Sequence, residues 1–465
     1  MQIFSLFLLI HSTCAFFGKF RIETREIRSP ITKTQDPIFN EIKGFYGIIG
    51  PDVDVKSITS LYELFTGDGM IQGVFFDKGK MTFVKHFVRT EKLLYESLHG
   101  RFSKNVCMTP LYVFLHKIGC LPNTLGLANT AFLQIEKKVF VLFERDYPYQ
   151  INIDVENQFI YTLNKNFIPN VPHFSGHSKY DGDTIHTIDY DVIQNQLIYN
   201  RLKSSFITKT RTVIKTHYIP LIHDFVVLPK KRILFIDSPF VWDIASIIPL
   251  HSPPVKFDRL RPTYITLYDT STNLVTPLIN QCQQLPINRC KQWLSPESFY
   301  MFHCAYFEEN GENIDIYASL YDNVDFSSLE IQGRYRRVTL HPSGKVTIIK
   351  NAALERLNLD FPVKYGKYII LRNIENQTIN GFIVCKGLNI IIRIKIPENR
   401  FFCGEPTVIE LGDKKTPYLL GLSYDDKGMG YVSLIGVFNE DYRELELEES
   451  VQIGFHSIYL SSSDS

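Results

Sequence analysis

The sequence predicts an all-β protein whose sheets close on themselves as a β-propeller. Many segments of strand length are rich in β-branched and aromatic residues, and glycine-containing turns join several of them into hairpins. No Pro/Gly/Ser-rich linker divides the 465 residues. A chain with this many antiparallel strands is too long for one sandwich, and radial repetition hides sheet edges, so a propeller is the natural candidate. Because no clean repeat is visible, the residues alone do not give the number of blades.

Five segments carry the strand pattern most clearly. They are Lys137–Glu144, Lys231–Asp237, Lys345–Lys350, Lys367–Arg372 and Tyr431–Phe438. Two hairpins are expected as well. One joins Gly381–Cys385 to Leu388–Ile396 through Lys386-Gly387, and the other joins Leu419–Tyr424 to Gly430–Phe438 through residues 425–429.

Helical periodicity is confined to two short segments, Lys56–Phe65 and Lys92–Leu98. The stretch Cys107–Cys120 breaks the β pattern, because it is apolar, carries few charges and lies between polar segments. We expect a buried helix or strand there. The functional alternative is an exposed apolar patch that touches a bilayer or admits an apolar substrate.

The N-terminal segment Met1–Phe17 resembles a targeting sequence. Ile3–Ile10 is apolar, and small residues around Ala15 offer a cleavage site, but no Lys or Arg precedes the run. Residues 1–15 are therefore either a signal peptide or an apolar arm, and residues 16–465 are expected to form one domain. No later stretch is apolar enough for a transmembrane helix.

Composition and motifs exclude several function classes. The chain has 50 basic and 49 acidic side chains and no basic block, which argues against a nucleic-acid partner. The eight cysteines form no CxxC pair, so zinc fingers and thioredoxin-like sites are not expected. The P-loop, nucleophile-elbow and HExxH patterns are also missing. The 35 Phe and 25 Tyr residues require a large core rich in aromatic rings.

Two motif-like features are interpreted as structural. His173 and His177 have a spacing that suits a helix face, but the proline, serine and glycine around them make a helix improbable there. Gly67-Asp68-Gly69 has only a superficial likeness to a phosphate-binding loop, and a simple turn is expected.

Four histidines on different parts of the chain stand out by their context: His177, His223, His303 and His456. The last three are framed by strand-like apolar residues. Each one alone could be a hydrogen-bonded core histidine. All four could converge on one point only if their strands converge, as the strands of a propeller do at its axis.

Several motifs, in this order, make the chain resemble the carotenoid cleavage oxygenases from about residue 44 to residue 460. They are Phe65–Ile71 (FTGDGMI), Val74–Lys80, Phe87–Glu91, Ala128–Ala131 (ANTA), Gly176–Asp181, Ile222–Phe225 (IHDF), Phe302-His303 and Gly454–His456 (GFH). No single motif is decisive, and the signal lies in their joint order and spacing.

The resemblance implies a seven-bladed propeller with a non-haem Fe(II) on its axis and a cap of helices and loops over its top face. The iron ligands and catalytic residues would be His177, His223, His303 and His456. The family's metal-bound histidines are oriented by carboxylates. The matching residues here are Glu144 for His223, Asp360 for His303 and Glu405 for His456.

The chain also departs from the family pattern. Asp360 replaces the usual Glu and is one methylene shorter, so its bond to His303 is expected to need a backbone shift or a water. The other departures are Tyr306 for Asn, Ser178 for Pro, Ser457 for Gly, Gln72 for His, and Phe143 where some members carry Thr. Since no iron ligand is lost, these departures concern substrate selectivity and rate more than metal binding.

In animal members of the family, the segment that matches residues 107–120 is an apolar membrane-docking loop beside the tunnel mouth. The resemblance therefore implies a peripheral membrane contact, and Cys107 is the nearest match to a cysteine that can be lipidated. Whether such a contact would be on the cytosolic face or in the secretory pathway depends on whether residues 1–15 are a signal peptide.

The function implied is an Fe(II) dioxygenase that uses dioxygen to cleave a conjugated double bond of a carotenoid or apocarotenoid into aldehyde or ketone products. A retinoid isomerohydrolase on the same iron site is an alternative. A non-catalytic carotenoid- or lipid-binding propeller, with Asp360 and Tyr306 marking a decayed site, is another, and a plain scaffold propeller is the simplest.

Overall fold

The computed structural model describes residues 17–18, 26–32, 36–53, 58–77, 79–103, 108–123, 125–165, 168, 171, 173–243, 245, 253–270 and 290–462. The predicted signal peptide or apolar arm, residues 1–15, lies outside the described residues. So does Cys107, on which the lipidation prediction depends.

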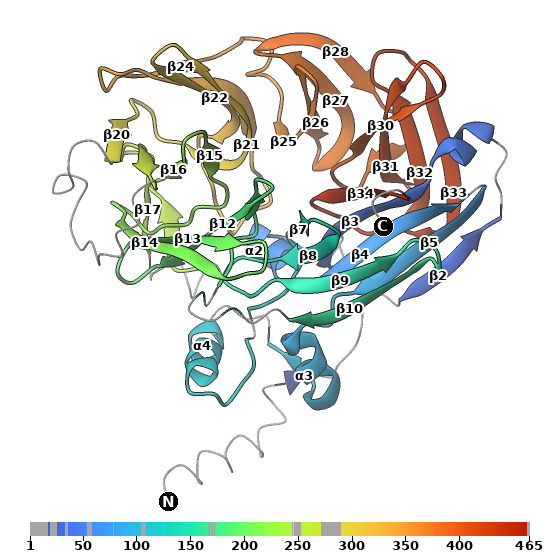
Figure 1. Ribbon diagram of the computed structural model, residues 1–465, viewed down its shortest axis with the longest axis horizontal. Helices are drawn as coiled ribbons and strands as arrows, with labels where there is room; N and C mark the ends of the chain where they lie inside the picture. The colour runs from blue at the N-terminus through green and yellow to red at the C-terminus, as the bar shows by residue number, and fades with distance from the viewer. Residues whose placement is uncertain are drawn as a thin grey trace, which may run out of the picture.

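Most of the described chain is β-structure, arranged in sheets that stand around a common centre (Figure 1). One sheet has the order β2 (Ile27–Ile31), β5 (Lys80–Phe87), β4 (Asp68–Asp77), β3 (Gly44–Asp52) and β34 (Ser457–Ser461). The next has β10 (Phe159–Lys165), β9 (Tyr149–Asp154), β8 (Lys138–Leu142) and β7 (Ala131–Ile135).

Three further sheets are four-stranded meanders in sequence order. They contain β11 (Lys179–Tyr180), β12 (Thr184–Asp191), β13 (Gln196–Lys203) and β14 (Thr208–Lys215); then β15 (Val226–Leu228), β16 (Arg232–Asp237), β19 (Tyr264–Asp269) and β20 (Cys290–Leu294); then β21 (Tyr300–Asn310), β22 (Asn313–Tyr321), β23 (Gly333–Leu340) and β24 (Val346–Ile349).

The last large sheet joins two meanders. The first is β25 (Leu359–Tyr365), β26 (Tyr368–Glu375), β27 (Thr378–Lys386) and β28 (Asn389–Lys395); the second is β30 (Thr407–Leu411), β31 (Thr416–Asp425), β32 (Met429–Gly436) and β33 (Tyr442–Ser450). Strand β29 (Arg400–Phe402) pairs with both β27 and β31 and so links them. Two small sheets pair β1 (Phe17–Gly18) with β6 (Arg101–Phe102) and β17 (Phe240–Trp242) with β18 (Val255–Phe257).

Strands from near both ends of the described chain meet in one sheet, which closes the ring. Strand β34 pairs antiparallel with β3, from Gly44↔Ser461 to Ile48↔Ser457. The N–H of Ile49 then donates to the carbonyl of His456 at 3.0 Å. The chain segment that carries the fourth histidine is therefore fixed by strands from the other end of the sequence.

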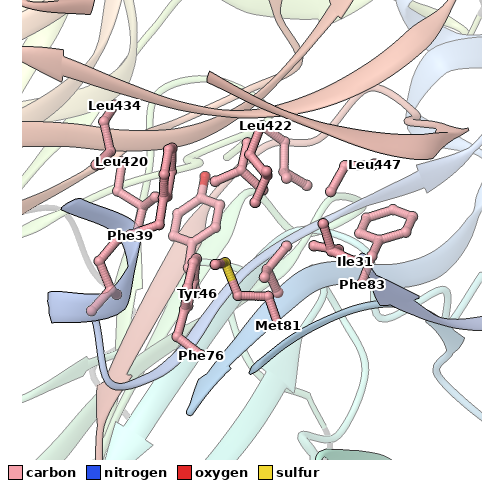
Figure 2. Close-up of a cluster of buried hydrophobic side chains, with 14 of the residues drawn as sticks. Ile31, Phe39, Tyr46, Phe76, Met81, Phe83, Leu420, Leu422, Leu434 and Leu447 are labelled. Atoms are coloured by element: carbon pink, nitrogen blue, oxygen red, sulfur yellow. The ribbon is translucent and has the colours of Figure 1, made fainter. Parts of the chain in front are cut away.

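In most sheets the first strand lies next to the centre, and in the sheet built from both ends of the chain the innermost strand is β34. Around the centre, β7 contacts β11 and β34, β34 contacts β30, β30 contacts β25, and β25 contacts β21. Since each of the four histidines lies in or just before such a strand, this arrangement is what brings them together. The side chains between neighbouring sheets form the core, and Figure 2 shows one such layer, where Tyr46, Phe76 and Met81 face Leu420 and Leu422.

The predicted strands are confirmed, with bounds shifted by a few residues, as β8, β16, β24, β26 and β32. Both hairpins are confirmed in antiparallel register. Their turns contain Gly387 at φ +58° and Gly428 at φ +87°, a region that glycine enters without steric cost. Of the two predicted helices, one is α3 (Glu91–His99), and the other is shortened to α2 (Leu61–Phe65). A short 3₁₀ helix, η1, spans Pro37–Glu41.

The expectation of a buried element in Cys107–Cys120 is wrong. The segment forms α4 (Thr109–Lys117), which stands outside the ring beside α3 (Figure 1). Only Tyr112 of the helix is buried, whereas Phe114 is 55% exposed and Ile118, just after it, 51%. The segment is apolar, as its sequence indicates, but only one narrow face of the helix packs against the protein and the other faces are partly or fully exposed.

The expected turn at Gly67-Asp68-Gly69 is also wrong, because β4 begins at Asp68. The N–H of Gly69 donates to the carbonyl of Leu127 at 2.8 Å, and a Cβ at this position would collide with the backbone of Ala128. Glycine is thus required for close backbone approach, and Asp68 pairs with buried Lys92 at 2.8 Å. Within the described residues, no helix is long and apolar enough to cross a membrane.

Candidate metal centre

The four predicted histidines lie together at the centre of the ring. His177 precedes β11, His223 precedes β15, His303 is within β21, and His456 immediately precedes β34. Their imidazole centroids are 4.5 to 5.4 Å apart in the pairs that contact. Residues as far apart as 177 and 456 in the sequence therefore form one cluster.

Ring nitrogens of the cluster point toward one another. Nε2 of His177 lies 3.0 Å from Nε2 of His223. His177, His303 and His456 each offer one nitrogen such that the three lie within 4.8 Å of one another, a spacing suited to a shared cation. His223 is outside that set of three and joins the cluster through its contacts with His177 and His303.

Each of the three predicted carboxylates lies against the Nδ1 of its expected histidine. Glu144 Oε1 is 2.6 Å from His223, Asp360 Oδ2 is 3.0 Å from His303, and Glu405 Oε1 is 3.4 Å from His456. A carboxylate at Nδ1 favours the tautomer that carries its proton there, which leaves Nε2 as a lone-pair donor. No such carboxylate contacts His177 among the described residues.

The electrostatics of the cluster keep the carboxylates ionised. Burial acts to raise the pKa of Glu144, Asp360 and Glu405, but the adjacent histidine, together with neighbouring hydrogen-bond donors and positive charges, outweighs burial and lowers each carboxyl pKa below its usual value. Burial lowers the pKa of His303, and lowers that of His177 well below its usual range. Burial acts to lower the pKa of His223, but the charge and hydrogen bond of Glu144, with the charges of Asp224 and Asp360, outweigh it and raise that pKa.

The shorter side chain of Asp360 reaches His303 directly because the backbone shifts locally. The β25–β26 register slips between Asp360 and Val363, and Phe361 has φ +54°. Such a bulge redirects a side chain toward the site. The expectation of a backbone shift agrees with this geometry, and no bridging water is needed. A phenol also holds the carboxylate, since Tyr321 donates to Oδ2 at 2.5 Å.

Two of the departures from the family pattern hold the segment around His456. The side-chain amide of Gln72 makes two hydrogen bonds with the backbone of Gln452, at 2.6 and 2.9 Å. The N–H of Ser457 donates to Glu405 Oε2 at 2.9 Å. Both residues therefore fix groups next to the metal centre without lining the cavity.

Two other departures are accommodated away from the ring nitrogens. The Tyr306 ring stacks on Tyr317 with centroids 4.2 Å apart, within a packed cluster. The Ser178 hydroxyl donates to the Ser175 carbonyl and to Thr187 Oγ1. The interpretation that His173 and His177 do not act as a pair agrees with the structure, because His173 contacts Asp189 at 3.1 Å and only His177 joins the cluster.

The ANTA segment connects the cluster to the rest of the fold. Asn129 donates to the carbonyls of Phe65 and Gly67, and so ties this segment to the FTGDG segment. The hydroxyl of Thr130 donates to Glu144 Oε2 at 3.3 Å. These contacts fix the carboxylate that orients His223.

An apolar cavity of about 290 Å³ adjoins the histidines, near the lower end of the range for small-molecule sites. His223, His303 and His456 line it, together with Phe143, and α2 covers part of it through Leu61 and Leu64. Much of the wall is aromatic: Phe65, Phe143, Tyr190, Tyr300, Phe302, Tyr321, Phe326, Phe361 and Phe455.

The donor set fits a borderline first-row dication such as Fe(II). Nε2 of His303 is buried and has no hydrogen-bond partner among the described residues, although an uncompensated buried nitrogen is costly. Several neutral imidazoles with carboxylates behind them are the usual environment of such an ion. A metal at the common point of the ring nitrogens would satisfy the orphaned atom.

Three side chains near the centre were not predicted from the sequence. Tyr321 holds Asp360, and Arg372 lines the cavity. Asp224 accepts from the N–H of Cys304 at 3.0 Å and pairs with Lys179 at 2.6 Å. Asp224 belongs to the IHDF motif and could have been found there, whereas no motif signals the other two.

Comparison with known proteins gives a family match over nearly the whole chain. The model of the family described as retinal pigment epithelial membrane protein matches residues 24–461. A carotenoid 9,10(9′,10′)-cleavage dioxygenase 1 of Arabidopsis thaliana is 28% identical over 50% of this chain and 45% of its own length. A carotenoid 9,10(9′,10′)-cleavage dioxygenase of Crocus sativus is 21% identical over 72% of this chain and 64% of its own length. The chain thus spans about half to two thirds of these relatives.

Solved structures extend the likeness to the fold. A variant of the Synechocystis apocarotenoid oxygenase superposes with a TM-score of 0.74 at 16% identity, covering 95% of this chain and 98% of that one. The cobalt-substituted form of that oxygenase gives 0.72 at 16% identity, covering 96% and 98%. The lignostilbene dioxygenase of Pseudomonas brassicacearum gives 0.71 at 14% identity, also over 96% and 98%. At these identities the likeness concerns the fold alone.

Proposed function

The chain belongs to the retinal pigment epithelial membrane protein family, the carotenoid oxygenases that its motifs resemble, and from this we propose that it is a non-haem Fe(II) dioxygenase. It cleaves a conjugated double bond of a carotenoid or apocarotenoid into aldehyde or ketone products. The observation that carries the proposal is the convergence of four histidines, three of them backed by carboxylates, beside an apolar aromatic cavity.

Different residues of the chain bind the metal, orient its ligands and bind the substrate. His177, His223, His303 and His456 hold the iron, and Glu144, Asp360 and Glu405 keep three of them in the tautomer that presents Nε2. When bound, Fe(II) supplies the redox chemistry that makes dioxygen reactive. The apolar walls exclude water, orient the polyene, and present ring faces that favour cationic character on it.

The proposal includes the finer architecture. Residues 16–465 form a single domain of seven blades, if the linked sheet is divided at β29 into β25–β28 and β30–β33. The closure of β34 onto β3 supports this division, because it completes the ring with strands from both ends. Helix α2 is part of the cap over the cavity.

The proposal also includes a peripheral membrane contact through α4 and the residues around it. Leu111, Phe114 and Ile118 are each more than two fifths exposed and lie within eight residues of one another. Exposed apolar side chains on one amphipathic helix suit the headgroup boundary of a bilayer. An apolar substrate dissolved in that bilayer could then enter the cavity without crossing water.

The test is product analysis with purified Fe(II)-loaded protein and a panel of polyenes under isotopically labelled dioxygen. The panel contains β-carotene, an apocarotenal, a stilbene and a retinyl ester. Labelled aldehydes or ketones that vanish with His303→Ala support the proposal, and their masses locate the cleaved bond. The surface variant Ile391→Ser, on the outer strand β28, serves as the matched active control.

Three other outcomes would reject the oxygenase. Retinyl ester converted without consumption of dioxygen selects an isomerohydrolase. Polyenes bound but not changed, with binding indifferent to His303→Ala, select a non-catalytic binding propeller. A protein that takes up no metal after reconstitution is a scaffold.

A further inference from the structure

Arg372 is a cationic side chain in the wall of the apolar cavity. It lies on β26, directly across from Asp360 on β25. Its guanidinium carbon is 3.3 Å from the centroid of the Phe361 ring, which itself stands 4.5 Å from the ring of His303. The arginine therefore reaches the same space as the metal centre, from the next strand of the sheet.

The guanidinium of Arg372 makes no hydrogen bond or ion pair within the part of the chain that the structure describes, and its Nε is buried. Asp360, directly across on β25, uses its Oδ2 for His303 and Tyr321, while its Oδ1 is buried and makes no hydrogen bond with Arg372 or with any other described residue. Arg336 on β23 shows the usual solution for a buried arginine, because it is paired bidentately with Asp322 and with Glu355. A half-buried guanidinium whose buried Nε makes no hydrogen bond calls for an explanation.

Arg372 stays charged in spite of its surroundings. Burial lowers its pKa to about 10, and this effect is only partly offset by Asp360, Tyr321 and Glu405. At neutral pH the side chain is therefore a cation with unused N–H donors that face an apolar space. A planar guanidinium presents these donors as a fork, which matches a carbonyl or carboxylate oxygen.

We propose that Arg372 recognises an oxygen on the ligand, a carbonyl or carboxylate group at the end of the polyene that enters the cavity. The preferred ligand class is then an oxygenated apocarotenoid or retinoid instead of a hydrocarbon carotene. This inference rests on the proposed function for the polyene, and it adds a selectivity determinant that no motif of the sequence carries.

The competing explanation is structural. In that case Arg372 only balances the charges of Asp360 and Glu405, and the ligand never touches it. Its removal would then lower the melting temperature and the iron content, and it would weaken every ligand to the same extent. The recognition role predicts the opposite pattern, because the guanidinium makes no hydrogen bond or ion pair with the described residues that its removal would break, and a methionine can keep the contact with the Phe361 ring.

The experiment measures equilibrium binding to full-length, Fe(II)-loaded protein under nitrogen, so that no turnover is required. The probes are a retinoid aldehyde, the matching retinoid acid and the matching retinoid hydrocarbon. The variants are Arg372→Met and Arg372→Lys, and the control is Arg393→Met, an exposed arginine on β28 of the same sheet. Thermal unfolding and iron content are recorded for each protein.

With Arg372→Met we expect affinity for the aldehyde and the acid to fall about tenfold or more, while affinity for the hydrocarbon and the melting temperature do not fall. Arg372→Lys keeps the positive charge but lacks the paired N–H donors of the guanidinium, so we expect an intermediate loss of affinity for the aldehyde and the acid. A uniform loss for all three probes, or no loss, overturns the inference. Selective loss in a protein that cleaves nothing under oxygen upholds Arg372 and rejects the oxygenase. A wild-type protein that binds none of the probes rejects both.

Discussion

The phenol of Tyr321 donates a 2.5 Å hydrogen bond to Oδ2 of Asp360, the same oxygen that lies 3.0 Å from Nδ1 of His303. All three side chains are buried. Tyr321 thus fixes the shorter carboxylate in the place where it can orient the histidine. The hydrogen bond from Tyr321 compensates for the shorter side chain of Asp360. It explains how an aspartate can orient His303 at a position where the family usually has a glutamate.

Tyr321→Phe should weaken iron binding without disturbing the core. The ring would keep its packing 4.9 Å from Phe302, but the carboxylate would lose a hydrogen bond of about 1.5–3 kcal/mol. We expect the Fe(II) affinity to fall about 10- to 100-fold, measured by competition with a chromogenic chelator. Tyr317 lies on the same strand as Tyr321, and its phenol accepts a hydrogen bond from Arg337 of β23, so Tyr317→Phe should leave the affinity unchanged. Equal affinities for Tyr321→Phe and the wild type would contradict the support role.

Gln72→Met should destabilise the segment that precedes His456. The substitution removes both hydrogen bonds between the buried amide and the backbone of Gln452. We expect the free energy of unfolding to fall by about 1–3 kcal/mol in urea titrations, with lower iron occupancy. Gln134→Met, exposed on β7, is the matched control and should change stability by less than about 0.5 kcal/mol. If the two variants have the same free energy of unfolding, the hydrogen bonds between Gln72 and Gln452 do not contribute to stability.

The convergence of the four histidines could be predicted because each belongs to a short motif in a specific order, whereas the three carboxylates followed only from the family that these motifs resemble. Hairpin turns were predictable for a local reason, since Gly387 and Gly428 occupy positive φ between complementary strands. Both the histidine motifs and the hairpin turns can be recognised from a few neighbouring residues in the sequence.

Tyr321 and Arg372 could not be predicted in the same way. Alternation along a strand assigns a side chain to one face of a sheet, but its partner on that face depends on how three strands pack. The exposure of Phe114 was missed for a related reason. An apolar helix has the same composition whether or not a neighbour covers it, so only the packed structure decides.

Acidification should destabilise the iron-free protein through His177. Burial, followed by repulsion from the neighbouring imidazoles, holds the pKa of His177 well below its usual value. In the unfolded chain this histidine takes up a proton as the pH falls below about 6.5, whereas in the folded site it stays neutral. Acidification therefore favours the unfolded chain, and the free energy of unfolding decreases as the pH falls below about 6.5. His303 acts in the same direction, and His223, with its raised pKa, in the opposite one.

The measurement is the urea midpoint of chelator-treated protein between about pH 7.5 and pH 5.5, a window around the ordinary histidine pKa. The midpoint should fall across this window. His177→Gln cannot take up the proton and should show a flatter dependence. A variant with the same slope as the parent would assign the pH dependence to other groups.

Phe114→Ser combined with Ile118→Ser should detach the protein from membranes while leaving its fold intact. Both side chains are about half exposed, so the folded state loses little burial when they are removed. A fully buried large apolar side chain contributes about 1.5–3 kcal/mol, and insertion of these two into the headgroup boundary would recover part of that. We therefore expect partitioning onto phosphatidylcholine vesicles, measured by sedimentation, to fall at least about tenfold with no change in melting temperature. Ile391→Ser removes a side chain of similar exposure from β28, on the opposite side of the ring from α4 (Figure 1). It should bind vesicles as the wild type does, and a comparable loss with Ile391→Ser would mean that adsorption is not localised to α4.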